Sequence, residues 1–284
     1  METIAPAKIN LFLEVLRRRD DGYHELRTLM CCIGLCDTLK VTLGGAVNRI
    51  RCDHPDVPSD ESNLALRAAE LFNHTLAGQT DIAPKHVTIE LAKRIPAGAG
   101  LGGGSSDAAA VLNLLNGAYK NPFNVAQLQH MALALGADVP FFILRQPALA
   151  GGIGERLEFF GGLSPWGVVV VYPGFGISTA QVFENLNLGL TKCKKKLRYF
   201  LFDQGKFDPS RHLCNDLEAV AISRFPVLGE IKNDLLNQGA VGSLMTGSGS
   251  AVFGLFADVP AAQKAADGLS GQRGWQIIAT ELRC

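Results

Sequence analysis

The chain has 284 residues, of which 47% are hydrophobic and 19% charged, with 27 basic and 27 acidic side chains. This composition supports a packed core and excludes a largely disordered chain. The balanced charge excludes a general attraction to nucleic acid or anionic membranes, so any phosphate site must be local. The N-terminal residues do not predict a secretory signal, and the most apolar short run, residues 168–171, is too short to span a bilayer.

The seven cysteines are an odd number and include no C-x-x-C pair, so they give no zinc signature. Cys31, Cys32 and Cys36 stand in an apolar run, and we interpret them as buried free thiols. Reduced thiols are typical of the cytoplasm. The sequence therefore predicts a soluble, cytoplasmic protein without nucleic-acid or membrane partners.

Predicted strands and helices alternate in the first half of the chain. Alternating apolar residues predict strands within 9–15, 39–43 and 87–91, and apolar spacings of three and four predict a helix over 62–76. A charged turn at 17–22 ends the first strand, and a loop with two prolines covers 53–59. A helix over 106–119 is expected to hold Asp107 in its first turn. Asn124 then caps a helix that stops at Gly136.

A glycine-dense stretch, residues 151–162, suggests a boundary between two domains, 1–150 and 151–284. Beyond it we expect a strand at 168–172, helices at 215–224 and 226–239, and strands at 241–245 and 251–256. A loop at 247–250, a helix at 260–268 and a strand at 276–280 complete the pattern. The basic residues within 192–198 are interpreted as an exposed loop or helix end. This order predicts an α+β fold with an antiparallel sheet.

The segment PAGAGLGGGSSD, residues 96–107, carries the strongest chemical signal. Glycine accepts positive φ and permits close approach to the backbone, and successive free N–H groups can surround an anion. The helix that follows adds its positive dipole end. The sequence predicts a phosphate cradle formed by Pro96, Ala97, Gly98, Ala99, Gly100, Leu101, Gly102, Gly103, Gly104, Ser105 and Ser106.

Three other kinds of phosphate loop fit this segment poorly. A Walker A loop needs a lysine after its glycines, and none follows here. A dinucleotide fingerprint needs an acidic residue about 20 positions further on, and residues 117–125 contain none. A protein-kinase loop needs H-R-D and D-F-G partners, which the chain lacks.

The segment resembles the second motif of the galactokinase, homoserine kinase, mevalonate kinase and phosphomevalonate kinase (GHMP) superfamily. PAKINL, residues 6–11, resembles the superfamily's N-terminal motif, and LMTGSGSAVF, residues 244–253, resembles its C-terminal glycine motif. The resemblance implies a two-domain GHMP-kinase fold, with a ribosomal S5 domain 2-like N-terminal domain that binds ATP and a ferredoxin-like C-terminal domain. It also implies an ATP-dependent small-molecule kinase.

Three further stretches narrow the resemblance: DGYHEL at 21–26, GADVPF at 136–141 and NDLE at 215–218. They resemble the branch of the superfamily that phosphorylates 4-diphosphocytidyl-2-C-methyl-D-erythritol in the non-mevalonate isoprenoid pathway. One departure is MCCI at 30–33, which stands in place of an aromatic-rich strand and bears on packing beneath the cytidine pocket.

The resemblance implies a catalytic pair, Lys8 and Asp138. Asp138 would orient or deprotonate the attacking hydroxyl, and Lys8 would stabilise the developing charge. From the residues alone, a helix-end turn is the favoured interpretation of Asp138, and a lysine that extends to solvent is the simpler interpretation of Lys8; the resemblance reverses the first.

The resemblance also implies binding residues. His24 is expected to hydrogen-bond cytosine and Tyr23 to stack on it, with Phe183 on the opposite face. Asn10, Thr246 and Gly247 are expected on the substrate side, and Asn63 and Leu64 near adenine. Mg²⁺ would accompany ATP, although no residue is assigned as its ligand. We expect a monomer or homodimer.

Three alternatives remain open at this point. A sibling kinase acting on mevalonate, homoserine or a sugar would not need the base-binding pair Tyr23 and His24. A nucleotide sensor without catalysis would not need both Lys8 and Asp138. A dinucleotide-dependent oxidoreductase is the most distant.

Overall fold

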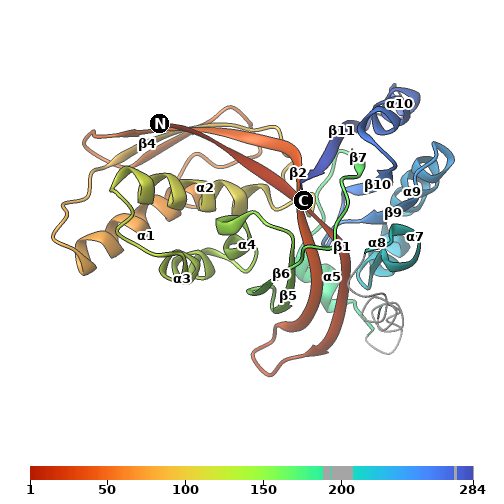
Figure 1. Cartoon of the computed structure of the whole chain (residues 1–284), viewed down its shortest axis with the longest axis horizontal. Coiled ribbons are helices and arrows are strands. Elements are labelled where there is room, and N and C mark those ends of the chain that lie inside the picture. Colours follow the sequence, from red (N-terminus) through yellow and green to blue (C-terminus); the bar gives the residue numbers. More distant parts are fainter. Residues whose placement is uncertain (188–192, 194–206, 272–273, 284) are drawn as a thin grey trace. The chain divides into compact units, whose positions relative to one another are not determined.

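The computed structural model describes residues 1–187, 193, 207–271 and 274–283 (Figure 1). The chain forms two compact units that interleave along the sequence. The first unit comprises Met1–Ala7, Cys36–Ala97 and Gly102–Arg145, and the second Lys8–Leu35, Gly98–Leu101 and Gln146–Cys284. The division into domains 1–150 and 151–284 stays a prediction.

The first unit builds helices onto a small mixed sheet. Strand β4 (Val87–Ala92) pairs antiparallel with the end of β2 (His24–Leu43) and parallel with β3 (Arg49–Cys52). Its alternation buries Val87, Ile89 and Leu91. Helix α1 (Leu64–Gln79) contacts β3 and β4 and packs on α2 (Gly103–Ala118). The remaining helices are α3 (Val125–Leu135) and α4 (Val139–Leu144).

The second unit is built on an antiparallel sheet whose order is β11, β7, β10, β9. These strands are β7 (Gly167–Tyr172), β9 (Gly242–Met245), β10 (Val252–Phe256) and β11 (Gln276–Arg283). Strand β1 (Glu2–Arg18) pairs parallel with β8 (Cys214–Asn215), and the start of β2 pairs with β5 (Ala148–Gly152). Strand β6 (Arg156–Phe159) pairs with β5.

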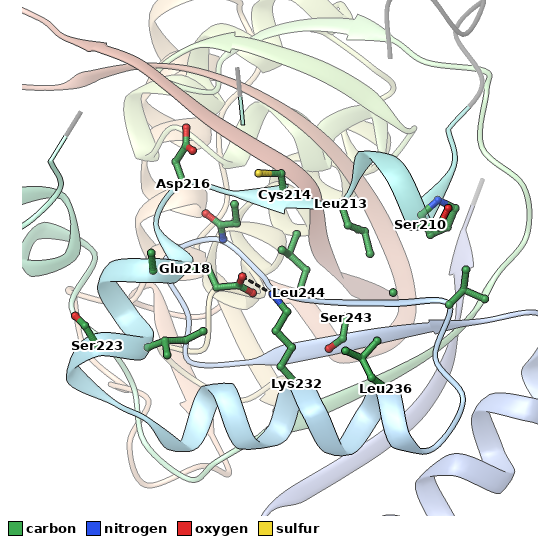
Figure 2. Close-up of a pocket in the computed structure, with 16 residues that line it drawn as sticks. Ser210, Leu213, Cys214, Asp216, Glu218, Ser223, Lys232, Leu236, Ser243 and Leu244 are labelled. Atoms are coloured by element: carbon green, nitrogen blue, oxygen red, sulfur yellow. Dashed lines mark hydrogen bonds and ion pairs between the residues drawn. The ribbon is translucent and has the colours of Figure 1, made fainter. Parts of the chain in front are cut away.

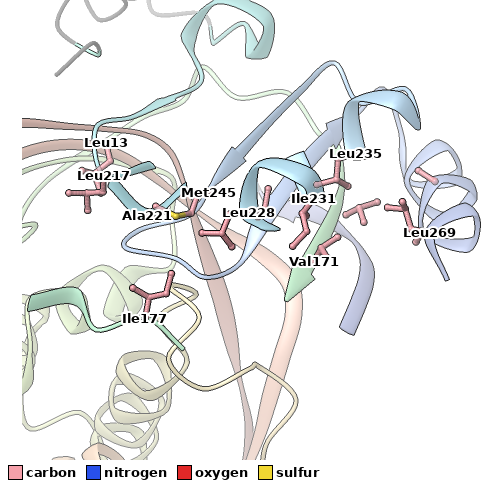
Figure 3. Packing of buried hydrophobic residues seen from close by; sticks show 14 of the residues in the cluster. Leu13, Val171, Ile177, Leu217, Ala221, Leu228, Ile231, Leu235, Met245 and Leu269 are labelled. Carbon is pink, nitrogen blue, oxygen red and sulfur yellow. The ribbon is translucent and has the colours of Figure 1, made fainter. Parts of the chain in front are cut away.

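Apolar side chains of this sheet and its helices form one core (Figure 3). Helices α9 (Val227–Asn237) and α10 (Val259–Leu269) pack on the strands. The other helices in the described part of this unit are α5 (Thr179–Glu184), α7 (Pro209–His212) and α8 (Glu218–Arg224). Figure 3 shows Val171, Met245, Ile231 and Leu235 within this core. Burial of such side chains contributes about 1.5–3 kcal/mol each, so the core supplies a firm base for the loops that leave it.

Helix α2 begins three residues earlier than the sequence predicts. Gly102 adopts the left-handed conformation, with φ 72°, and caps the helix, which therefore includes Gly103 and Gly104. Glycine disfavours helix interiors, which is why the prediction began after them. Asp107 consequently lies in the second turn and not in the first.

Two further predictions need correction. Asn215 belongs to β8, so the predicted helix over 215–224 begins only at Glu218. The sheets are mostly antiparallel as predicted, but β3 with β4 and β1 with β8 are parallel. The basic run at 192–198 lies outside the described residues, except for Cys193.

The cysteines follow the prediction only in part. Cys31 and Cys32 are buried free thiols, and Cys36 is a half-buried one. Cys193 and Cys214, however, form a disulfide, so the expectation of reduced thiols is wrong for this pair in the structure. Within the described residues, every helix is too short or too polar to cross a membrane.

Candidate functional site

A buried chain of polar groups in the second unit connects two of the sequence motifs. The Lys8 ammonium donates to Asn10 Oδ1 at 2.6 Å, and the Asn10 backbone N–H donates to Thr246 Oγ1 at 3.0 Å. Asn10 Nδ2 donates to Thr28 Oγ1 at 2.8 Å, and that hydroxyl donates to the Phe12 carbonyl. Lys8 is 3% exposed, so it does not extend to solvent.

The same series of hydrogen bonds extends to the glycine-rich loop. Thr246 Oγ1 lies 3.4 Å from the Gly100 carbonyl, and the backbone N–H of Lys8 donates to the Leu101 carbonyl at 2.9 Å. Ala251 N–H donates to the Ala99 carbonyl at 3.1 Å. Residues from three distant motifs are therefore held together within the second unit, and Thr28, which no sequence pattern indicated, joins them.

Gly100 shows why glycine is required in this loop. Its φ is 77°, and a Cβ built on it would lie 2.3 Å from the Thr246 carbonyl oxygen. Any other residue would force the two loops apart. Gly100 therefore serves close packing of the two backbone loops.

The NDLE motif, residues 215–218, supports this arrangement through hydrogen bonds to backbone groups. Asn215 Nδ2 donates to the Met245 and Gly247 carbonyls at 2.8 and 2.7 Å, and so fixes the start of the C-terminal glycine loop. Asp216 accepts from the Val15 backbone N–H at 2.9 Å, and Glu218 accepts from Met245 N–H at 3.0 Å. These side chains are structural, and they position the loop that carries Thr246.

Of the predicted base-binding residues, the structure brings two together. The rings of His24 and Phe183 are stacked, with centroids 4.8 Å apart and planes 25° from parallel. Burial, and then the charge of Arg18, lower the pKa of His24, so its imidazole is neutral at pH 7. Tyr23 is 61% exposed. Because His24 already stacks on Phe183, the two predicted faces of a cytosine pocket are not assembled in this conformation.

In the first unit, predicted phosphate-binding residues lie at the N-terminus of α2. Its N-cap residue, Gly102, has no side chain to cap the first N–H groups, so within the described structure they receive no side-chain cap. The buried Ser106 Oγ has no hydrogen-bond partner among the described residues. Leu64 lies against the first turn of α2, since a Cβ built on Gly104 would be 3.7 Å from Leu64 Cδ1.

The other predicted first-unit residues have clear local roles. Asn63 caps α1 by accepting from Ala65 N–H at 2.9 Å, and its Nδ2 donates to the Pro58 carbonyl. Pro96 is buried and Ala97 half-buried at the entry to the glycines. Asp138 is half-buried and immediately precedes α4. Lys8 belongs to the second unit and Asp138 to the first, so their pairing stays a proposal.

The sequence did not indicate a buried ion-pair cluster next to the α2 N-terminus. The Lys93 ammonium is bonded to Asp37 Oδ2 and, at 2.9 Å, to Asp107 Oδ2. All three side chains are nearly inaccessible. Burial opposes the charge of Lys93, but the two carboxylates outweigh it and raise the pKa of the ammonium. Burial is also the main cause that raises the pKa of Asp107 to about 7, against the attraction of Lys93.

A cavity of about 720 Å³ in the second unit contains none of the predicted site residues (Figure 2). Figure 2 shows Glu218 and Lys232 pointing toward one another inside it, 2.5 Å apart. Asn215 and Asp216 form part of its wall, yet both direct their polar atoms to backbone groups. The cavity is therefore lined by the NDLE motif and not by the predicted site residues.

Comparison with known proteins places these features in a family. The family described as GHMP kinases N terminal domain matches residues 63–146, and GHMP kinases C terminal matches residues 202–273. A 4-diphosphocytidyl-2-C-methyl-D-erythritol kinase of Syntrophotalea carbinolica is 46% identical over 98% of this chain and 97% of its own. The kinase of the same name from Geobacter sulfurreducens is 44% identical over 95% of each chain.

Comparison with solved structures leads to the same family. A crystal structure of 4-(cytidine 5'-diphospho)-2C-methyl-D-erythritol kinase matches with a TM-score of 0.81 and 41% identity, covering all of both chains. A mevalonate kinase from L. major, at 17% identity and a TM-score of 0.69 over 100% of this chain and 96% of its own, shares the fold. The chain belongs to the 4-diphosphocytidyl-2-C-methyl-D-erythritol kinase family of the GHMP kinases.

Proposed function

We propose that this protein transfers the γ-phosphoryl group of ATP to the 2-hydroxyl of 4-diphosphocytidyl-2-C-methyl-D-erythritol, a step toward isoprenoid precursors. The observation that carries the proposal is the buried chain from Lys8 through Asn10 and Thr246 to Gly100. It ties the lysine of the N-terminal motif to the phosphate loop and to the C-terminal glycine loop. Family membership supplies the substrate.

The phosphates of ATP would lie on the N–H groups at the start of α2. Those groups carry the positive end of the helix dipole, and Ser106 offers a buried hydroxyl that needs a partner. Pro96, Ala97 and the glycines that follow shape the approach. Asn63 and Leu64, beside the same turn, would bound the adenine.

The chemistry follows from two side chains. The substrate oxygen forms a bond to the γ-phosphorus while the bond from that phosphorus to the ADP oxygen breaks. Asp138 accepts the proton of the 2-hydroxyl as its oxygen attacks. Lys8, fixed by Asn10, stabilises negative charge as it develops on the transferring oxygen atoms.

The cytidine end would be recognised by His24, Tyr23 and Phe183. A neutral imidazole offers one donor and one acceptor to a pyrimidine edge, and the exposed ring of Tyr23 can close over the base. We propose that substrate binding separates Phe183 from His24 so that the base enters between rings. Asn10, Thr246 and Gly247 would face the methylerythritol hydroxyls.

Mg²⁺ would be held mainly by the phosphates. Among the described residues, the one group of three potential metal ligands is Cys193, Cys214 and Asp216, and its two sulfur atoms are bonded to each other. No protein cage for the ion is therefore assigned. When bound, Mg²⁺ neutralises phosphate oxygens. We further propose a cytoplasmic monomer or homodimer, in which case the Cys193–Cys214 bond would be reduced in the cell.

A direct assay tests the proposal. ADP release is measured with the cytidine substrate, with mevalonate, with homoserine and without any acceptor, and ³¹P NMR locates the new phosphate. We expect turnover with the cytidine substrate at least a hundredfold above the other three. Equal turnover with mevalonate or homoserine would favour a sibling kinase, and release of no ADP with the cytidine substrate would overturn the proposal.

A further inference from the structure

The cluster of Asp37, Lys93 and Asp107 distributes its hydrogen bonds unequally. Asp37 accepts from the backbone N–H groups of Arg94 at 2.6 Å and Ile95 at 2.9 Å, as well as from the Lys93 ammonium. Asp107 accepts from Lys93 through Oδ2, whereas its Oδ1 is buried and has no hydrogen-bond partner in the part of the chain described. One cation thus serves two buried carboxyl groups, only one of which is otherwise satisfied.

This asymmetry decides which carboxyl group takes a proton. Asp37 accepts from three N–H donors, whereas Asp107 accepts from one. Two carboxylates that share one site cannot both stay charged without cost, so a proton is held between them. Asp107 receives it, in agreement with the pKa of about 7 that burial gives this group.

The cluster lies next to the first turn of α2, which we call the phosphate-binding turn. A Cβ built on Gly103, the first residue of α2, would be 3.1 Å from Lys93 Nζ. Asp37 holds the backbone that leads into the glycines, and Asp107 belongs to α2 itself. The cluster therefore joins the entry of the loop to its exit, and its net charge acts on whatever the turn binds.

We propose that Asp107 is a positioning residue for ATP, whose proton sets both the charge behind the phosphate-binding turn and the affinity of that turn. With Asp107 protonated the cluster is neutral. With Asp107 ionised it carries one negative charge, which repels the phosphates. At an effective dielectric of about 20, one added charge close to the phosphates is expected to weaken binding about tenfold. The inference rests on the proposed use of this loop as the ATP site.

Other titratable groups face the cluster from neighbouring elements. At the end of β3, burial raises the pKa of Cys52, and the charges of Lys93 and Asp107 also act on that thiol. Asp53 is exposed and accepts from the Lys93 backbone N–H at 2.9 Å. Among the described residues, only Asp37 and Lys93 act strongly on Asp107, and the thiol is uncharged around neutrality.

The test compares wild type with Asp107→Asn, which has the shape of the protonated acid and cannot titrate. KM for ATP is measured from pH 6 to 8.5, and binding of a non-hydrolysable ATP analogue is measured by calorimetry. We expect equal KM values at pH 6 and a wild-type value about tenfold higher than that of the variant at pH 8.5. Dividing the wild-type KM by the variant KM at each pH cancels the effect of the ionisation of ATP itself.

Asp53→Asn is the matched control, because it makes the same change on an exposed carboxylate beside the same lysine. Its KM ratio to wild type should stay near one at every pH. A ratio for Asp107→Asn that does not change with pH would overturn the inference while leaving the proposed function intact. If wild-type protein fails to bind the analogue at any pH, the proposed function itself is wrong.

Discussion

Among the described residues, each unit contains a buried lysine near the glycine-rich loop, Lys8 in the second unit and Lys93 in the first, and the groups that accept from them differ. In the second unit, Lys8 donates to the amide oxygen of Asn10, which carries no net charge. In the first unit, Lys93 is shared by the carboxylates of Asp37 and Asp107. The amide oxygen orients the ammonium of Lys8, whereas the two carboxyl groups hold the ammonium of Lys93 in a buried cluster. A buried lysine near a phosphate loop is therefore not by itself a catalytic group, and its partners decide its role.

Removal of the Lys8 ammonium should give the largest effect on catalysis. In Lys8→Met the aliphatic part of the side chain is kept and the charge is lost. We expect kcat to fall about a thousandfold, equivalent to about 4 kcal/mol of transition-state stabilisation. Steady-state kinetics measures this, and the thermal midpoint shows whether the fold is retained. A variant that folds and keeps a tenth of the wild-type kcat would remove Lys8 from the mechanism.

The same substitution at Lys93 should act on stability instead. Lys93→Met leaves Asp37 and Asp107 buried without their shared cation, which costs about 3–5 kcal/mol of unfolding free energy. Urea denaturation measures the loss. Adding Asp107→Asn removes one of the two buried carboxyl groups and should recover part of it. If Lys93→Met is as stable as wild type, Lys93 does not stabilise the two buried carboxyl groups. The contrast between Lys8 and Lys93 would then fail.

The sequence could predict a phosphate-binding segment because the pattern that predicts it is local. Glycines followed by a helix predict an anion site wherever they occur, and the structure has α2 begin at Gly103. The Asp37–Lys93–Asp107 cluster was missed because its members are 56 and 14 residues apart, so no spacing reveals them. Only the folded first unit brings them together.

Strand β2 shows a second limit of sequence patterns. The prediction found residues 39–43 but not the preceding part, because residues 28–33 are buried without alternation. A strand covered on both faces reads as a plain apolar run. The bond between Cys193 and Cys214 was missed for a related reason, since connectivity cannot be deduced from cysteine positions alone.

The two parts of the glycine-rich loop should respond differently to an added methyl group. In Gly100→Ala, the new Cβ meets the Thr246 carbonyl at 2.3 Å and the backbone keeps a positive φ. We expect a loss of at least about 2 kcal/mol of unfolding free energy. In Gly104→Ala the nearest atom, Leu64 Cδ1, is 3.7 Å away, and the helix should gain about 0.5–1 kcal/mol. Denaturant titration of both variants should separate them clearly, and equal stabilities would show that the Gly100 contact does not persist.

The smallest expected effect concerns His24, whose environment lowers its pKa chiefly by burial and secondarily through Arg18. Since the unfolded chain has the ordinary value of about 6.5, the folded state binds fewer protons just below that pH. The contribution of His24 to stability is therefore present above about pH 6.5 and is lost as the pH falls through its folded value. NMR titration should give a pKa below 6.5 in wild type. Phe183→Leu opens the stacked face and should raise the value more than Arg18→Gln does, because burial is the larger cause. The reverse order would mean that the charge of Arg18, and not the stacked ring, governs the protonation of His24.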